Sequence, residues 1–300
     1  MHKRHKRLKI AIITATAMLV GTLVAARPKI RPLTRTPVRG VTPAQLEAAR
    51  TYLGFDRNDY PSDSLLTALH MEFSFAGYWL NDPPGETAST WLGKRSILGA
   101  HGFGFLLLFN GRLDKELNST PGATELGRRD GAEAVSIALR EGFPKGATVF
   151  LDQEEGGHLL PEQNAYLFAW VDEVSARGFK AGVYCSGIPA PDGPGQFVIT
   201  ANDVKQHEGV RKIAFFVYND ACPPSPGCAR PANPPAPSES GVAFASVWQF
   251  AQSPRRPEYS AACSSMYAKD RNCYPGQRAG ASGLFLDLDS ALSPDPSNGK

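Results

Sequence analysis

The chain has 300 residues, of which 42% are hydrophobic, 10% aromatic and 20% charged, a composition that supports a packed core. Its formal net charge of +3 misleads, because five cationic residues lie within the first nine positions. Without these five the charge is about −2, which argues against a folded domain that binds nucleic acid. The length suits a single barrel domain of about 250 residues.

The first segment, 1–26, has the features of an export signal. A cationic stretch from His2 to Lys9 precedes an apolar run from Ile10 to Ala26. This run also reaches the lower length limit for crossing a bilayer, so the segment is either a cleaved signal peptide or a retained membrane anchor. Either alternative places the rest of the chain outside the cytoplasm, as a secreted, periplasmic or cell-envelope protein. The anchor alternative adds a membrane tether.

Residues 27–41 are rich in Pro and Arg and have no apolar period, which predicts a linker. The domain, 42–292, begins at Thr42, where Thr42-Pro43-Ala44-Gln45 has the spacing of a helix cap. The polar residues 293–300 are expected to form a flexible tail.

Short apolar runs alternate with segments of helical period, which is typical of parallel α/β structure. Because the runs are almost continuously apolar, both faces of the sheet should be buried, and eight of them favour closure into a (β/α)8 TIM-type barrel. The last third, after residue 219, has no clear helical period, so helices should be missing between strands six and eight. We expect strands at Gly54–Asp56, Phe75–Leu80, Gly104–Phe109, Thr148–Asp152, Lys180–Cys185, Ile213–Tyr218, Ser246–Phe250 and Gly283–Leu288. We expect helices at Ser64–Phe73, Thr90–Ala100, Glu125–Glu141, Pro161–Arg177 and Ala201–Val210.

The chain contains five cysteines. Two pairs bracket short loops, Cys222 with Cys228 and Cys263 with Cys273, as expected for disulfides in an oxidising compartment. Cys185 lies in an apolar run and is expected to be a buried free thiol. No Cys or His spacing suggests zinc, and we expect neither a metal nor a cofactor.

The strongest functional signal is an acidic run at the end of the fourth expected strand. Because side chains alternate along a strand, Asp152 and Glu154 should point the same way, into the mouth at the carboxyl end of the barrel. Two carboxyls so close should not both ionise freely, so the pKa of one should rise, as a general acid requires. The alternative is that these acids only cap the following loop.

Further acids end two other expected strands. Asp56 closes the first, and Asp287 and Asp289 close the last. In a closed barrel the first and last strands are neighbours, so these acids should face Asp152 and Glu154 across the mouth. Such a set of carboxylates could protonate a leaving oxygen and stabilise a cationic sugar. For Asp56 alone, a role in the following turn is the alternative.

Aromatic and amide side chains recur at the strand ends, where they could stack on sugar rings and form hydrogen bonds with them. Any one ring could equally belong to the core. With Asp289, the expected substrate-binding residues are Tyr78, Trp79, Tyr184, Tyr218, Trp248 and Gln249.

These motifs together resemble those of a known family. Gly54-Phe55-Asp56, Asp152-Gln153-Glu154, Trp248-Gln249-Phe250 and Leu286-Asp287-Leu288-Asp289 are similar, in order, to the signatures of family 25 glycoside hydrolases, the Chalaropsis-type lysozymes. The match is closer to the glycoside-hydrolase-like domain of unknown function family 1906, whose opening motif and second strand resemble Gly54-Phe55-Asp56 and Gly77-Tyr78-Trp79. The resemblance spans roughly 54–292.

The resemblance implies cleavage of peptidoglycan or another cell-wall polysaccharide, with Glu154 as the general acid, Asp152 as its partner, and Asp56 and Asp287 as further mouth acids. Asp289 departs from the family 25 pattern, which usually has Asn there, and so does the Pro-rich insert after the sixth strand. Two other functions stay open. One is a glycan-binding module without turnover. The other is a metal-dependent hydrolase, although no His accompanies the strand-end acids.

Overall fold

The structure, a computed structural model, describes residues 50–219, 233–252, 284 and 286–300. All of these residues lie in one compact unit, Glu47–Lys300. In this described part of the chain, no helix is both long and apolar enough to cross a membrane. The expected export segment, the linker, the helix at Thr42 and both cysteine pairs lie outside the described residues.

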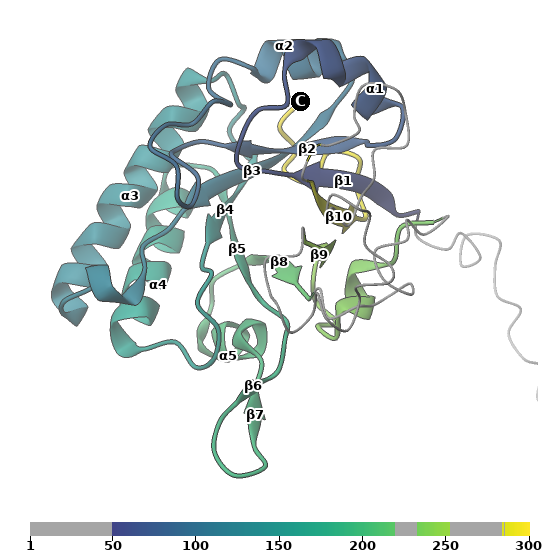
Figure 1. The fold of residues 1–300 in the computed structure, drawn as a ribbon. Helices are drawn as coiled ribbons and strands as arrows, with labels where there is room; N and C mark the ends of the chain where they lie inside the picture. Colours follow the sequence, from purple (N-terminus) through teal and green to yellow (C-terminus); the bar gives the residue numbers. More distant parts are fainter. Residues whose placement is uncertain (1–49, 220–232, 253–283, 285) are drawn as a thin grey trace, which may run out of the picture. The chain divides into compact units, whose positions relative to one another are not determined.

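Eight strands close into a barrel in the order β1-β10-β9-β8-β5-β4-β3-β2, which confirms the predicted fold class (Figure 1). A separate hairpin, β6 (Ala190–Pro191) paired with β7 (Phe197–Val198), extends from the barrel after β5. The barrel strands are β1 (Tyr52–Asp56), β2 (Phe75–Trp79), β3 (Gly104–Asn110), β4 (Thr148–Asp152), β5 (Lys180–Ser186), β8 (Ala214–Tyr218), β9 (Val247–Ala251) and β10 (Asp287–Ala291).

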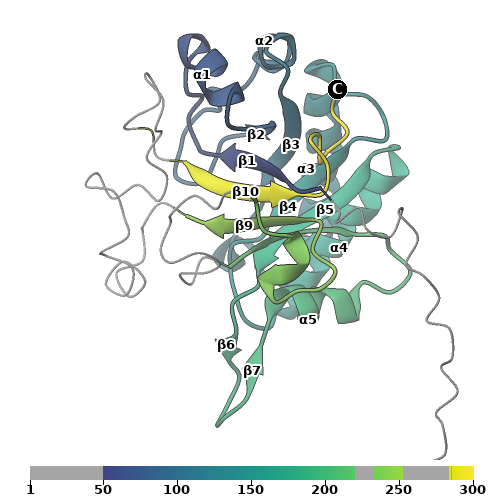
Figure 2. The same ribbon diagram turned by 90° about the vertical axis from the view of Figure 1, so that its right-hand side faces the viewer.

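The last strand differs from its prediction in both position and direction. It begins at Asp287, where the strand expected at Gly283–Leu288 was about to end, and it runs antiparallel to both β1 and β9. All other neighbouring pairs in the barrel are parallel. Leu286 is fully buried just before the strand begins, so its apolar character predicts a strand one residue too early. Figure 2 shows β10, in yellow, between β1 and β9.

Helices cover the outside of the barrel. The longest pair, α3 and α4, pack so closely that a Cβ atom on Gly127 would lie 2.3 Å from the carbonyl oxygen of Tyr166. Helix α3 begins earlier than predicted because the Ser119 side chain accepts a hydrogen bond from the Gly122 N–H and caps it. Between β8 and β9, the described residues contain only a 3-10 turn, η4 (Pro237–Ser240), in agreement with the helix-free connection expected there. The helices are α1 (Leu66–His70), α2 (Arg95–Ala100), α3 (Thr120–Arg140), α4 (Pro161–Ala176) and α5 (Thr200–His207).

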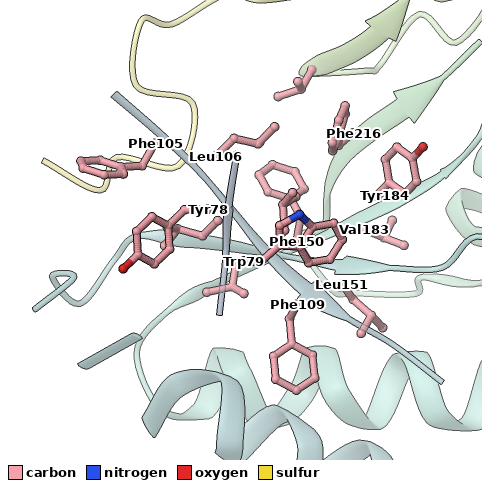
Figure 3. Close-up of a cluster of buried hydrophobic side chains, with 14 of the residues drawn as sticks. Tyr78, Trp79, Phe105, Leu106, Phe109, Phe150, Leu151, Val183, Tyr184 and Phe216 are labelled. Carbon is pink, nitrogen blue, oxygen red and sulfur yellow. The ribbon is translucent and has the colours of Figure 1, made fainter. Parts of the chain in front are cut away.

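The barrel interior is filled by rings that fit beside glycines. A Cβ atom on Gly182 would lie 2.3 Å from the ring of Phe150, and one on Gly54 would lie 2.1 Å from the ring of Phe75. Phe150 in turn packs edge-to-face on Phe216 (Figure 3). Phe109 of β3 lies on the outer face of the barrel, where it packs near Trp170 of α4. This two-residue alternation decides which side chains can reach the mouth.

The C-terminal residues close the amino-terminal end of the barrel. The backbone N–H of Ser297 donates to Phe105 O, its carbonyl oxygen accepts from Thr148 N, and its hydroxyl accepts from Leu107 N. Asp295 accepts from the N–H of Phe105. These groups complete β3 and β4 where the two strands do not yet pair with each other. The prediction of a flexible tail at 293–300 is therefore corrected, since this segment is ordered beside β3 (Figure 2).

Candidate functional site

A cavity of about 250 Å³ opens at the carboxyl end of the parallel strands. Its walls combine residues predicted from the sequence with others that the sequence analysis missed. The predicted ones are Asp56, Trp79, Asp152, Glu154, Tyr184, Tyr218, Gln249 and Asp287; the missed ones are Asn58, Pro84, Leu108, Phe216 and Gln252.

Asp152 and Glu154 reach this cavity from β4 and from the loop that directly follows it. Alternation along the strand turns both side chains inward, as expected from their spacing. Their environments differ: Asp152 is 5% exposed, whereas Glu154 is open to solvent. The pair therefore combines a desolvated carboxyl with a solvated one.

Asp287 arrives at the mouth by a route that the sequence did not indicate. Because β10 is antiparallel, Asp287 begins its strand and is paired in register with Asp56, which ends β1. The prediction placed Asp287 near the carboxyl end of a parallel strand. The structure places it at the amino-terminal end of an antiparallel one, which lies at the same edge of the barrel. Four carboxyl groups thus line one cavity.

Burial raises the pKa of Asp152 well above its ordinary value, and the charges of Glu154 and Asp56 raise it further. The raised pKa expected within the Asp152–Glu154 pair therefore falls on Asp152. Its neutral form is favoured beside a solvent-exposed carboxyl. A contrast of this kind between two neighbouring carboxyls is what separates acid and base roles in acid catalysis.

A chain of hydrogen bonds orients Asp56. Gln249 Nε2 donates to Asp56 Oδ2 at 2.6 Å, and the Tyr184 hydroxyl donates to Gln249 Oε1 at 2.7 Å. Gln252 Nε2 donates to the Tyr184 hydroxyl at 3.0 Å. Burial raises the pKa of Tyr184, and the charges of Asp152 and Asp56 add to the effect, so Tyr184 remains a neutral donor. The only sequence signal for Gln252 was its place three residues after Gln249 at a strand end.

Aromatic rings form two walls of the cavity. The rings of Tyr184 and Tyr218 lie 5.3 Å apart, and the Tyr218 hydroxyl lies 3.5 Å from the carbonyl oxygen of Glu154. The indole N–H of Trp79 donates to the carbonyl oxygen of Arg57, which fixes the ring at the cavity wall. Figure 3 shows Trp79 and Tyr184 among the side chains around the barrel.

Two residues predicted to bind substrate do not reach the cavity. Tyr78 is fully buried on the outer face of β2, where its hydroxyl donates to Glu141 at 2.5 Å. Trp248 is buried on the outer face of β9, where its indole N–H donates to Asn219 O and its ring packs against Phe250. Both predictions were wrong for the same reason: each ring adjoins an inward-facing residue, so alternation directs it outward.

Asp289 is a third residue that was predicted to bind substrate but does not reach the cavity. It lies beneath the cavity and does not line it. It is 0% exposed and is paired in register with Gly54 on one side and Gln249 on the other. Burial raises its pKa well above the ordinary value, and the charges of Asp56 and Asp287 and a hydrogen bond with Asp56 raise it further. The prediction that Asp289 contacts a substrate directly is therefore corrected.

In the described part of the chain, no three His, Cys, Asp or Glu side chains are arranged to hold a metal ion. Cys185 is buried and unpaired, as expected, and burial raises the pKa of its thiol. Cys185 therefore has the character of a core residue and not of a reactive thiol.

The described residues form a closed α/β barrel with four carboxyl groups at its mouth. Residues 91–191 match the family model described as Rv2525c-like, glycoside hydrolase-like domain. This range includes Asp152, Glu154 and Tyr184. No curated protein is a significant match to the sequence.

Solved structures with a similar fold come from several bacteria. An uncharacterized protein of B. stearothermophilus has a TM-score of 0.51 and 18% identity, over 80% of this chain and 95% of that one. The Tat-secreted protein Rv2525c of Mycobacterium tuberculosis, in complex with L-tartrate, has a TM-score of 0.47 and 13% identity, over 82% and 97%. A family 25 glycosyl hydrolase from Bacillus anthracis has a TM-score of 0.47 and 9% identity, over 81% and 89%.

Proposed function

We propose that this protein is an exported glycoside hydrolase that cleaves glycosidic bonds in peptidoglycan or another cell-wall polysaccharide. The observation that carries the proposal is the convergence of Asp56, Asp152, Glu154 and Asp287 on one open cavity at the barrel mouth. The family description of residues 91–191 as glycoside hydrolase-like supports it. Export rests on the N-terminal signal, and the cell-wall substrate rests on the resemblance of the motifs.

Glu154 is assigned as the general acid, because it is the mouth carboxyl that is exposed to an incoming substrate. It would protonate the leaving glycosidic oxygen. Asp152 stands beside it, desolvated and biased toward its neutral form, and would share the proton of the pair as the reaction proceeds.

The opposite wall would stabilise the cationic sugar. Asp56, held by Gln249, and Asp287, paired with it in register, supply carboxyl groups for the positive charge that develops on the ring. Tyr184, Tyr218 and Trp79 supply ring faces and hydroxyls that would bind and orient the sugar.

A second function is a glycan-binding module without turnover. The observation that favours it is the 5% exposure of Asp152, which leaves that carboxyl little direct access to substrate. Such a module would use the same aromatic walls but would not need Glu154 to transfer a proton.

The test compares wild type with Glu154→Gln on a panel of polysaccharides that includes peptidoglycan. We expect wild type to release reducing ends, and Glu154→Gln to lose about 10³-fold or more of that rate, because the carboxamide cannot donate a proton. Glycan binding should survive in the variant. The matched control is Glu133→Gln, the same change at an exposed position of α3, which should keep full activity. Equal binding by both proteins with no release of reducing ends by either would establish the binding module instead.

A further inference from the structure

Asp289 occupies an unusual position for an acidic residue. It lies in the middle of β10, between Gly54 of β1 and Gln249 of β9, and it is completely buried. The Phe75 ring fills the space beside Gly54, so apolar volume lies next to Asp289 on that side. A charged carboxylate in such a place requires either a cationic partner or several N–H donors.

Neither form of compensation is found for Asp289 in the described residues. The charged groups that act on it are Asp56 of β1 and Asp287 of its own strand, which are both acidic. On the other side, β9 presents Gln249, whose Nε2 donates to Asp56 instead. No N–H or O–H of the described residues donates to either oxygen of Asp289. An ionised Asp289 would therefore be a buried charge without support.

A neutral Asp289 removes this difficulty, because a protonated carboxyl can itself donate a hydrogen bond. Its neighbour Asp56 offers the acceptor, since a hydrogen bond between the two carboxyls is among the causes of the raised pKa of Asp289. We propose that Asp289 is a positioning residue that works in its neutral form, donating its carboxyl hydrogen to Asp56 and thereby fixing the ionised Asp56 beneath the substrate. The catalytic consequence rests on the proposed glycosidase function, whereas the protonation state of Asp289 does not.

In this arrangement Asp56 receives two donors from below the cavity, Gln249 at 2.6 Å and the carboxyl of Asp289. Hydrogen bonds to the charged form of a carboxylate favour that form. The neutral state of Asp289 also spares Asp56 a repulsive charge from an adjacent strand. Asp56 can then remain charged while it lies close to Asp152 and Asp287.

The first test uses proton linkage to folding and needs no substrate. A carboxyl that keeps its proton in the folded state makes the protein less stable as pH rises above about 4, where the unfolded chain loses that proton. Asp289→Asn, a neutral donor of similar shape, should remove up to one proton per molecule from this linkage. Its stability relative to wild type should therefore increase with pH. Asp59→Asn, at an exposed position, is the matched control and should leave the linkage unchanged.

The second test uses turnover. Asp289→Ala should lower kcat by about tenfold or more by removing a donor to Asp56, with KM nearly unchanged because Asp289 does not line the cavity. Asp289→Asn should restore kcat, since its amide N–H can replace the carboxyl donor.

The outcomes are separable. Unchanged proton linkage in Asp289→Asn overturns the inference, whatever the activity. The inference is also overturned if Asp289→Asn loses as much kcat as Asp289→Ala. The amide of Asn is always neutral and can donate, so it would then have failed to replace the carboxyl donor. A wild type without hydrolase activity, together with the expected change in linkage, overturns the proposed function but supports the neutral Asp289.

Discussion

The two ends of the barrel are built from the same strands but differ in how their polar groups are satisfied. At the amino-terminal end, Ser297 and Asp295 satisfy backbone groups of β3 and β4, and Gly104 leaves room for Pro294. At the mouth, carboxyl groups crowd together, and burial raises the pKa of Asp152. One end therefore stabilises the fold, while the other retains an electrostatic cost. Substitutions at the mouth should therefore lower activity without loss of stability, whereas changes at the amino-terminal end should lower stability and leave activity unchanged.

The largest effect is expected at the mouth. Asp152→Asn should lower kcat by about 10³-fold, because the carboxyl that shares the proton of the acid pair is lost. The same variant should be more stable than wild type above about pH 4, and increasingly so as pH rises, because it lacks a buried carboxyl that keeps its proton in the folded state while the unfolded chain loses it. Kinetics and denaturant unfolding at several pH values measure both effects. Loss of stability at neutral pH would contradict the electrostatic account.

A large effect on stability is expected at the other end. Deletion of residues 294–300 leaves the N–H groups of Phe105, Leu107 and Thr148 without their partners. The free energy of unfolding should fall by about 3–9 kcal/mol, since each of the three buried N–H groups left unsatisfied costs about 1–3 kcal/mol. The specific activity of the folded fraction should stay at the wild-type level. A truncated protein with wild-type stability would show that the segment does not close the barrel.

A smaller effect distinguishes two tyrosines on opposite faces of the sheet. Tyr184→Phe should lower kcat/KM by about tenfold, because Gln249 Oε1 loses one of its two donors and keeps only Gln252, so its hold on Asp56 weakens. Tyr78→Phe should leave activity unchanged and cost about 1 kcal/mol of stability through its lost bond to Glu141. Equal effects of the two substitutions on activity would show that the inward and outward faces are assigned incorrectly.

The comparison also shows what the sequence could reveal. Continuous apolar runs predicted the parallel strands and the closed barrel, because burial on both faces leaves a clear pattern. Strand direction leaves no such pattern. Leu286 is buried although it lies before the strand, and β10 was predicted four residues early and in the wrong direction. Asp287 still reached the mouth, because an antiparallel strand begins where parallel strands end.

The errors at the site have physical causes as well. Alternation was applied to Asp152 and Glu154 but not to Tyr78 and Trp248, whose ring character suggested sugar binding although each adjoins an inward-facing residue. The polar residues of the C-terminal segment suggested a flexible tail, because composition does not show which backbone groups such side chains complete. Gln252 was not predicted, because a glutamine indicates a site only when its hydrogen-bond partners are known.

The most direct measurement is the fate of water oxygen during digestion. Wild-type protein incubated with peptidoglycan in H₂¹⁸O should release fragments that carry one ¹⁸O at the new reducing end, detected by mass spectrometry, and Glu154→Gln should release none. Soluble fragments without ¹⁸O at a reducing end, or equal release by both proteins, would contradict glycosidic hydrolysis by the acids at the barrel mouth.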